Sequence, residues 1–428
     1  MKLDYKRTMY VGLAFMSICA FWQVYDGIVP LILKNTFHVG DALAGVIMAL
    51  DNVLALFMLP LFGALSDKTH SKMGRRMPFI VGGTTLACLS MLIIPFANSL
   101  VSLPLFFVGL GVVLFAMSTY RSPAVALMPD VTMKPLRSKA NAVINLMGAI
   151  GGIIMLGAIP VLVSKKEHPS FFPLFAFTIA VMIICVSVLV WKIKEPLCVK
   201  QMHTDSLAAG VANEEKSDNA HAGAKLPKDV FISLCFILAS VFFWFMGYNA
   251  VTTAFSKYAN ITWGMQGGNY ALVLLVAQAA AIVSYLPVGF LASKVGRKRT
   301  IQIGIIMLAT AFASAMFFKT FTGMIFFFFA LAGIGWAFIN VNSYPMVVEM
   351  SGGADVGKYT GYYYTFSMLA QIITPILSGV LLQEIGYTTL FPYGAFFVAL
   401  SFVTMLFVRH GDSRPAAKKN IEAFDVDD

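Results

Sequence analysis

Long apolar stretches alternate with short polar ones along nearly the whole chain. A helix crosses the hydrocarbon core of a bilayer with about 20 apolar residues. Twelve stretches reach that length, in two groups of six. The first group comprises 8–33, 42–65, 78–98, 102–129, 138–163 and 171–193, and the second comprises 230–256, 268–292, 300–318, 322–349, 359–383 and 388–408. The pattern predicts an all-α membrane protein with twelve transmembrane helices.

A polar, Ala- and Gly-rich segment without hydrophobic periodicity, residues 195–229, separates the two groups. Such a composition is typical of a flexible linker. We therefore expect an N-terminal six-helix bundle at 1–194, a cytoplasmic linker at 195–229, a C-terminal six-helix bundle at 230–410 and a cytoplasmic tail at 411–428.

The composition agrees with a membrane protein. The chain is 58% hydrophobic and 12% charged, whereas soluble domains are about 45–50% apolar and about 25% charged. The five cysteines lack C-x-x-C spacing, and the six histidines fall in loops or at helix ends, so neither a disulfide framework nor a metal site is expected. The first apolar run lacks a small-residue cleavage site, which indicates an uncleaved helix.

The net charge of +10 is a topology signal. With both termini in the cytoplasm, 25 of the 31 Lys and Arg residues lie on the cytoplasmic side, five lie opposite, and Arg121 lies within a helix. Cytoplasmic loops of membrane proteins carry such an excess. The distribution predicts a multi-pass protein of the plasma or inner membrane and argues against nucleic-acid binding.

The two halves share short motifs in the same order, as expected of an internal repeat. Pro60 is followed by Gly63, and the second half has Pro287 followed by Gly289. The other matches are Tyr25-Asp26 with Tyr248-Asn249 and Arg121-Ser-Pro123 with Ser343-Tyr-Pro345. The repeat predicts two pseudo-symmetric bundles.

The segment from Pro60 to Phe79, PLFGALSDKTHSKMGRRMPF, resembles the loop signature of the major facilitator superfamily (MFS). More narrowly, it is similar to the form P-x-x-G-x-x-S-D…S-[RK]-x-G-R-R-x-P-F of sucrose/proton symporters and their animal relatives, near the glycoside–pentoside–hexuronide cation symporters. Pro123-x6-Asp130 and Ala140-Asn-Ala142 also resemble that branch. The resemblance implies the MFS fold and sugar transport.

The resemblance also implies that Asp67 fastens the second helix to the cytoplasmic start of the eleventh, where the helix dipole is positive. Gly74 would supply the tight turn. A plain positive-inside loop explains the basic residues but not the Gly63/Asp67 spacing, and the second half has Ser293 in place of Asp67. The gating candidates are Gly63, Asp67, Gly74, Arg75, Arg76, Asp130 and Glu349.

Two departures from the resembled families bear on ion coupling. Melibiose-type symporters bind sodium through two acids at positions where this chain has Ala55 and Leu59. Plant sucrose symporters carry an acid within the fourth helix, where this chain has none before Asp130. The coupling site therefore has to be argued from the charges inside the membrane.

Three charged residues, Asp26, Asp51 and Arg121, lie away from the ends of the predicted helices, and at a helix centre each costs about 2.5–3.5 kcal/mol to insert. At 1.5 Å per residue, Asp51 lies roughly 15 Å and Arg121 roughly 13 Å deep, so depth favours a direct pair, with Asp26 nearer the outer surface. Proton-linked sugar porters instead pair an acid of the first helix with an arginine of the fourth, which would be Asp26 with Arg121. A static pair that only holds helices together is a third interpretation, although buried ion pairs stabilise poorly.

In the repeat, Asp26, Asp51 and Arg121 correspond to neutral Asn249, Gln278 and Ser343. We expect proton handling in the first half and hydrogen bonding to a sugar in the second. Aromatic residues in membrane helices are also commonly packing or belt residues. The substrate-binding candidates are Trp22, Gln23, Tyr25, Asn145, Trp244, Tyr248, Asn249, Gln278, Asn340, Asn342 and Gln371.

These observations predict a proton-coupled symporter of a sucrose- or maltose-like glycoside that works by alternating access. We expect a monomer in lipid with no cofactor, and sodium is disfavoured as the coupling ion. A proton-driven exporter of drugs or other amphipathic compounds is the alternative, although its cavity should hold fewer Asn, Gln and Tyr residues. A non-transporting membrane sensor would need a folded cytoplasmic domain. An enzyme is disfavoured because no nucleophile–base or metal spacing is present.

Overall fold

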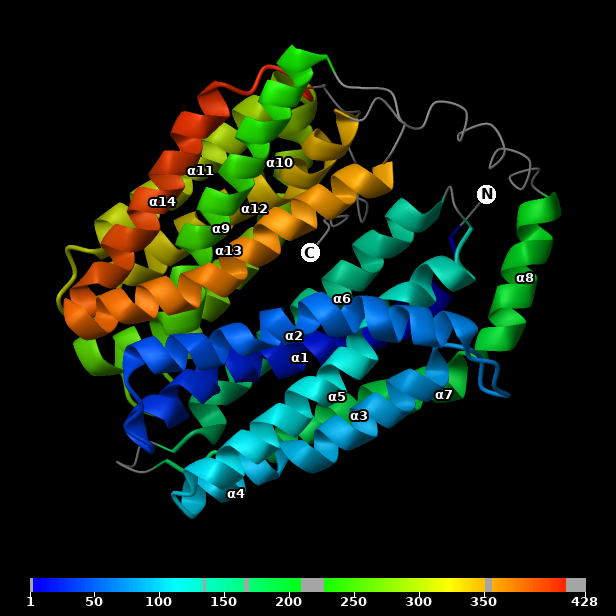
Figure 1. The fold of residues 1–428 in the computed structure, drawn as a ribbon, viewed down its shortest axis with the longest axis horizontal. Coiled ribbons are helices and arrows are strands. Elements are labelled where there is room, and N and C mark those ends of the chain that lie inside the picture. Colours follow the sequence, from blue (N-terminus) through cyan, green and yellow to red (C-terminus); the bar gives the residue numbers. More distant parts are fainter. Residues whose placement is uncertain (1–2, 134–135, 165–168, 209–226, 351–355, 413–428) are drawn as a thin grey trace. The chain divides into compact units, whose positions relative to one another are not determined.

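The computed structural model describes residues 3–133, 136–164, 169–208, 227–350 and 356–412, and within these ranges every regular element is a helix (Figure 1). The elements of the first half are α1 (Tyr5–Asn35), α2 (Asp41–Lys68), α3 (Met77–Met91), α4 (Ile93–Ser99), α5 (Leu103–Val131), α6 (Arg137–Leu162), α7 (Phe172–Lys192) and α8 (Glu195–Ala208). Those of the second are α9 (Lys228–Thr262), α10 (Tyr270–Val295), α11 (Arg297–Ala315), α12 (Met324–Glu349), α13 (Val356–Glu384), the short 3₁₀ helix η4 (Tyr387–Thr389) and α14 (Leu390–Leu406).

Ten spans in the described ranges are long and apolar enough to cross a membrane, with α3–α4 and η4–α14 each counted as one. α10 adds an eleventh, bent by 52° between Tyr285 and Pro287, where proline removes a backbone donor and kinks the helix. α11 is not among these spans, because three of its 19 residues are basic and begin the helix; it corresponds to the predicted span 300–318. The prediction of an all-α membrane protein is confirmed.

The prediction of a flexible linker over 195–229 is wrong for its first part, because the helix α8 occupies Glu195–Ala208. This helix is too polar to show a hydrophobic stripe, which is why the sequence pattern missed it. Its first residue, Glu195, is buried and accepts backbone hydrogen bonds from the start of α3. The rest of the linker up to residue 226 and the tail from residue 413 lie outside the described residues.

The chain divides into two compact units. Unit 1 comprises Met1–Val39, Leu50–Ala212 and Met265–Leu272, and unit 2 comprises Gly40–Ala49, Asn213–Gly264 and Val273–Asp428. The boundaries thus differ from 1–194 and 230–410 in three places: α8 joins unit 1, and the first residues of α2 and α10 each pack in the unit that does not hold the rest of their helix.

Helix packing repeats between the units. In unit 1, α1 packs against α6 and α7, and α3 packs against α5 and α7. In unit 2, α9 packs against α13 and α14, and α11 packs against α12 and α14. The sequence motifs had paired α1 with α9 and α5 with α12, and the packing adds α3, α6 and α7 as the equivalents of α11, α13 and α14.

Candidate transport site

Unit 1 contains all three charged residues that were predicted to lie inside the membrane: Asp26 on α1, Asp51 on α2 and Arg121 on α5. The two acids are close enough to interact electrostatically, and Asp51 also interacts with Arg121. Among these described residues, neither acid forms an ion pair with Arg121 within 4.0 Å. The direct Asp51–Arg121 pair is therefore not formed in this structure, although Asp51 is the acid that interacts with the arginine.

Arg121 instead lies over an aromatic ring. Its guanidinium carbon is 5.9 Å from the centroid of the Trp22 ring, a distance at which the negative face of the ring attracts a cation. Asp51 accepts a hydrogen bond of 2.8 Å from the Asn52 side-chain amide. Arg121 thus contacts an aromatic ring and Asp51 a neutral amide, and neither residue forms an ion pair with the other.

Two buried donors beside these charges lack a partner: Trp22 Nε1 and the Tyr25 hydroxyl have no hydrogen bond among the described residues. The Tyr25 hydroxyl interacts electrostatically with both acids. An unpaired buried donor costs about 1–3 kcal/mol, and such groups call for a specific explanation. A bound polar ligand would pair them. Gln23 and Asn145 are half-buried on α1 and α6 of the same unit.

Unit 2 presents an aromatic stack that the sequence did not reveal. The rings of Tyr248 on α9 and Trp336 on α12 are parallel, with centroids 3.7 Å apart and an interplanar angle of 6°. Phe245 meets Trp336 edge-on at 5.3 Å. Trp336 was not among the predicted binding residues. The available signal was its position four residues before Asn340, on the same face of one helix.

The predicted amides of unit 2 lie on α9, α10, α12 and α13, and several are bonded within their own helix. Asn249 and Asn342 each donate at 2.9 Å to the carbonyl one turn earlier, and Gln371 does so at 3.4 Å. Gln278 is half-buried on α10, and Asn340 is buried on α12. Trp244 is fully buried, and its Nε1 is unpaired among the described residues.

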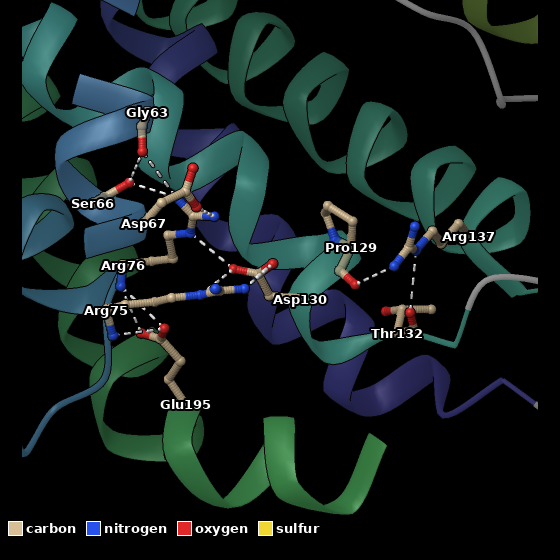
Figure 2. A network of polar contacts seen from close by, with 10 residues as sticks. All are labelled: Gly63, Ser66, Asp67, Arg75, Arg76, Pro129, Asp130, Thr132, Arg137 and Glu195. Carbon is tan, nitrogen blue, oxygen red and sulfur yellow. Dashed lines mark hydrogen bonds and ion pairs between the residues drawn. The ribbon is translucent and has the colours of Figure 1, made fainter. Parts of the chain in front are cut away.

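The signature loop forms a network of polar contacts at one end of unit 1, here called the brace (Figure 2). Arg76 is 5% exposed. Its guanidinium donates to Asp130 on α5 at 2.8 Å and contacts Ser66 and Asp67 on α2. Arg75 reaches the same Asp130 carboxylate at 2.6 Å. The loop thus ties α2, α3 and α5 together.

Glu195 completes this brace and was missed by the sequence analysis. Its carboxylate accepts hydrogen bonds of 2.9–3.1 Å from the backbone N–H groups of Arg75, Arg76 and Met77 (Figure 2). A carboxylate at a helix N-terminus satisfies orphan donors and favours the helix dipole. Gly74 adopts a φ of +112°, and a Cβ there would collide with Glu195, so the expected tight turn requires glycine.

Unit 2 has a reduced copy of the brace. Gly296 has a φ of +93°, and Asp412 accepts a hydrogen bond of 2.9 Å from the Lys298 backbone. The guanidinium of Arg297 pairs with Glu349 at 2.8 Å. An acid after the sixth span therefore supports the turn before the third span in each half. That shared position was the signal available in the sequence.

The sequence predicted that Asp67 fastens the second helix to the start of the eleventh. In this structure Asp67 pairs with Arg76 inside unit 1, and residues 351–355, which precede α13, lie outside the described residues. We still expect Asp67→Asn or Gly63→Leu to slow transport several-fold without weakening equilibrium substrate binding, because the loop lies far from Asp51. Uptake rates and binding isotherms of the same preparations test this. A loss of affinity with normal exchange rates would contradict it.

The Major Facilitator Superfamily model matches residues 11–284 and 237–425, which together cover most of the chain. The chain belongs to the major facilitator superfamily. The fold agrees: the solved nucleoside transporter NupG superimposes with a TM-score of 0.68 over 95% of this chain and 100% of that one, at 16% sequence identity. This MFS protein is therefore a transporter and not an enzyme.

Two kinds of curated relative resemble this MFS transporter. Sucrose transport protein SUT3 of Oryza sativa subsp. indica is 28% identical over 139 residues, which cover 28% of each protein. The chain thus matches about a quarter of the length of the rice protein. Multidrug resistance protein 2 of Bacillus subtilis is 27% identical over 395 residues, covering 91% of this chain and 92% of the relative.

Proposed function

We propose that this transporter carries a neutral glycoside or oligosaccharide together with protons. The observation that carries the proposal is the division of polar groups between the units. Unit 1 holds Asp26, Asp51 and Arg121, which interact without being locked in an ion pair. In unit 2, acids and bases lie toward the ends of the described helices, and amides and aromatic rings occupy the middle.

Each half of this division suits one part of the task. A carboxyl with a nearby but movable guanidinium can take up or release a proton when that cation shifts. Sugars offer hydroxyl groups to amides and flat C–H faces to aromatic rings, as the Tyr248–Trp336 stack provides. The match to a plant sucrose transport protein covers only 139 residues, but it supports the same substrate class.

Export of amphipathic compounds is the second candidate, because the Bacillus multidrug relative matches nearly the whole chain. Uptake of a panel of radiolabelled sugars into vesicles, with and without an inward proton gradient, separates the two. Symport predicts accumulation of at least one glycoside only when the gradient is present. Efflux of a fluorescent cationic dye without sugar accumulation would favour export instead.

Arg121→Ala is expected to remove the pH dependence of transport. Without the guanidinium, Asp51 loses the neighbouring charge whose movement would favour uptake or release of a proton, so transport no longer follows the external pH. The rate of uptake should become nearly independent of the external pH. Arg121→Lys, which keeps the charge, serves as the matched control and should retain a pH response. A pH profile unchanged by Arg121→Ala would contradict this role.

A further inference from the structure

One end of α2 belongs to unit 2, although the rest of the helix belongs to unit 1. Unit 2 takes in Gly40–Ala49, and unit 1 resumes at Leu50, while α2 runs unbroken from Asp41 to Lys68. A single continuous helix therefore has residues in both units. Any transport cycle that moves one unit against the other has to act on this segment.

The segment is held by a buried group of three residues, here called the Asp41 cluster: Asp41, Lys257 and Tyr387. The Lys257 ammonium donates to the Asp41 carboxylate at 2.8 Å, and the Tyr387 hydroxyl lies 2.8 and 2.9 Å from its two oxygens. The side chains of the ion pair are 5% and 3% exposed. α2, α9 and η4 thus meet at one carboxylate, at the end of the helices that the charge distribution assigns to the outside.

The backbones of α2 and α13 also approach closely here. A Cβ at Gly45 would collide with the Pro375 carbonyl, and a Cβ at Gly379 would lie 2.5 Å from the Asp41 carbonyl oxygen. The Ala42 N–H donates to the Gln383 side chain at 3.2 Å. The contact is therefore specific in shape as well as in charge.

The equivalent segment of the repeat makes a contact without charges. The first residues of α10 pack in unit 1, where Gly27 would place a Cβ 2.5 Å from the Tyr270 hydroxyl. Residues 265–272 contain no acidic or basic side chain. A contact without charges is therefore sufficient to hold this kind of helix end, so the ion pair on α2 requires another explanation.

A buried ion pair contributes little net stabilisation, because the cost of desolvating both charges offsets most of their attraction. The same property makes it easy to open, since both charges recover their hydration when they separate. Removing one partner is different, because the remaining charge is then buried without a counter-ion. The ion pair of the Asp41 cluster can therefore hold the helices together when it is formed and can also break reversibly.

We propose that the Asp41 cluster is a gate residue set that closes the transport path at the end opposite the signature loop and opens once in every cycle. The proposal rests on transport by alternating access and not on the identity of the substrate. It assigns functional roles to Asp41, Lys257 and Tyr387, none of which the sequence motifs indicated.

Cysteine accessibility tests the gate without a substrate. Ala44 lies on the buried face of the same helical turn, so Ala44→Cys is introduced after replacement of the five native cysteines. Open membrane fragments, which expose both sides, are treated with a charged maleimide. The parent should label slowly, and Lys257→Met or Asp41→Asn should label about tenfold faster or more, because the closed state loses its ion pair.

Three matched variants complete the experiment. Lys257→Arg keeps the charge, and Lys319→Met removes an exposed lysine instead; both should label at the parental rate. The exchange Asp41→Lys/Lys257→Asp should label more slowly than either single variant. A second reporter, Ser240→Cys in the buried core of α9, should stay unlabelled throughout. Equal labelling of parent and single variants, or faster labelling at both reporters, would overturn the proposal.

Discussion

Asp51→Asn is expected to abolish accumulation of substrate driven by a proton gradient while leaving substrate-for-substrate exchange close to the parental rate. The amide keeps the shape of a protonated carboxyl but cannot bind and release a proton. Exchange needs no net proton movement, so it survives. With one proton per substrate, a gradient of one pH unit supports about tenfold accumulation in the parent, and the variant should only equalise the two concentrations.

The structure supports Asp51 for this test because it is the acid that interacts both with Asp26 and with Arg121. Exchange and uphill uptake are measured in the same vesicles, so a folding defect, which would lower both, is recognised. Asp205→Asn changes an exposed acid of α8 in the same way and serves as the control. If Asp51→Asn still accumulates substrate at the parental stoichiometry, Asp51 is not the proton carrier, and Asp26 becomes the residue to test.

Glu195→Ala should strongly lower the thermal stability of the protein, because Glu195 supports the signature loop. The substitution leaves the backbone donors of Arg75, Arg76 and Met77 without their acceptor. Hydrogen bonds to a charged group contribute about 1.5–3 kcal/mol each, although water can replace part of that here. A shift of about 2–4 °C in melting temperature accompanies each kcal/mol lost in a unit of this size, so a decrease of several degrees is expected.

Thermal unfolding in detergent, followed by the loss of monodisperse protein, measures this effect. Asp412→Ala should lower the melting temperature less, because Asp412 accepts one backbone hydrogen bond from Lys298 at an exposed site. Glu384→Ala, at an exposed acid near the end of α13, should leave it unchanged. Equal melting temperatures for Glu195→Ala and Glu384→Ala would show that Glu195 does not support the loop.

The membrane spans, the repeat and the signature loop could all be predicted from the sequence. Hydropathy is averaged over a whole span, so it survives errors of a few residues at each end. The repeat needs only the order of short motifs. Gly74 was predicted correctly because a short loop before a helix requires a backbone that few residues adopt, and the structure gives it a φ of +112°. The helix α8 was missed because it is too polar to show a hydrophobic stripe, and the loop that its Glu195 contacts is distant in sequence.

Which side chains contact one another could not be predicted from the sequence and became clear from the packing of the helices. Adjacent residues of a helix point about 100° apart, so a partner depends on how each helix is rotated and tilted, which hydropathy does not record. Depth alone brought Asp51 and Arg121 to one level, yet Arg121 lies over Trp22. From the sequence, Lys257 was only one of the five basic residues assigned to the side opposite the cytoplasm. The packing of three helices buries it against Asp41 and Tyr387, and that environment, which no local pattern encodes, gives it a role.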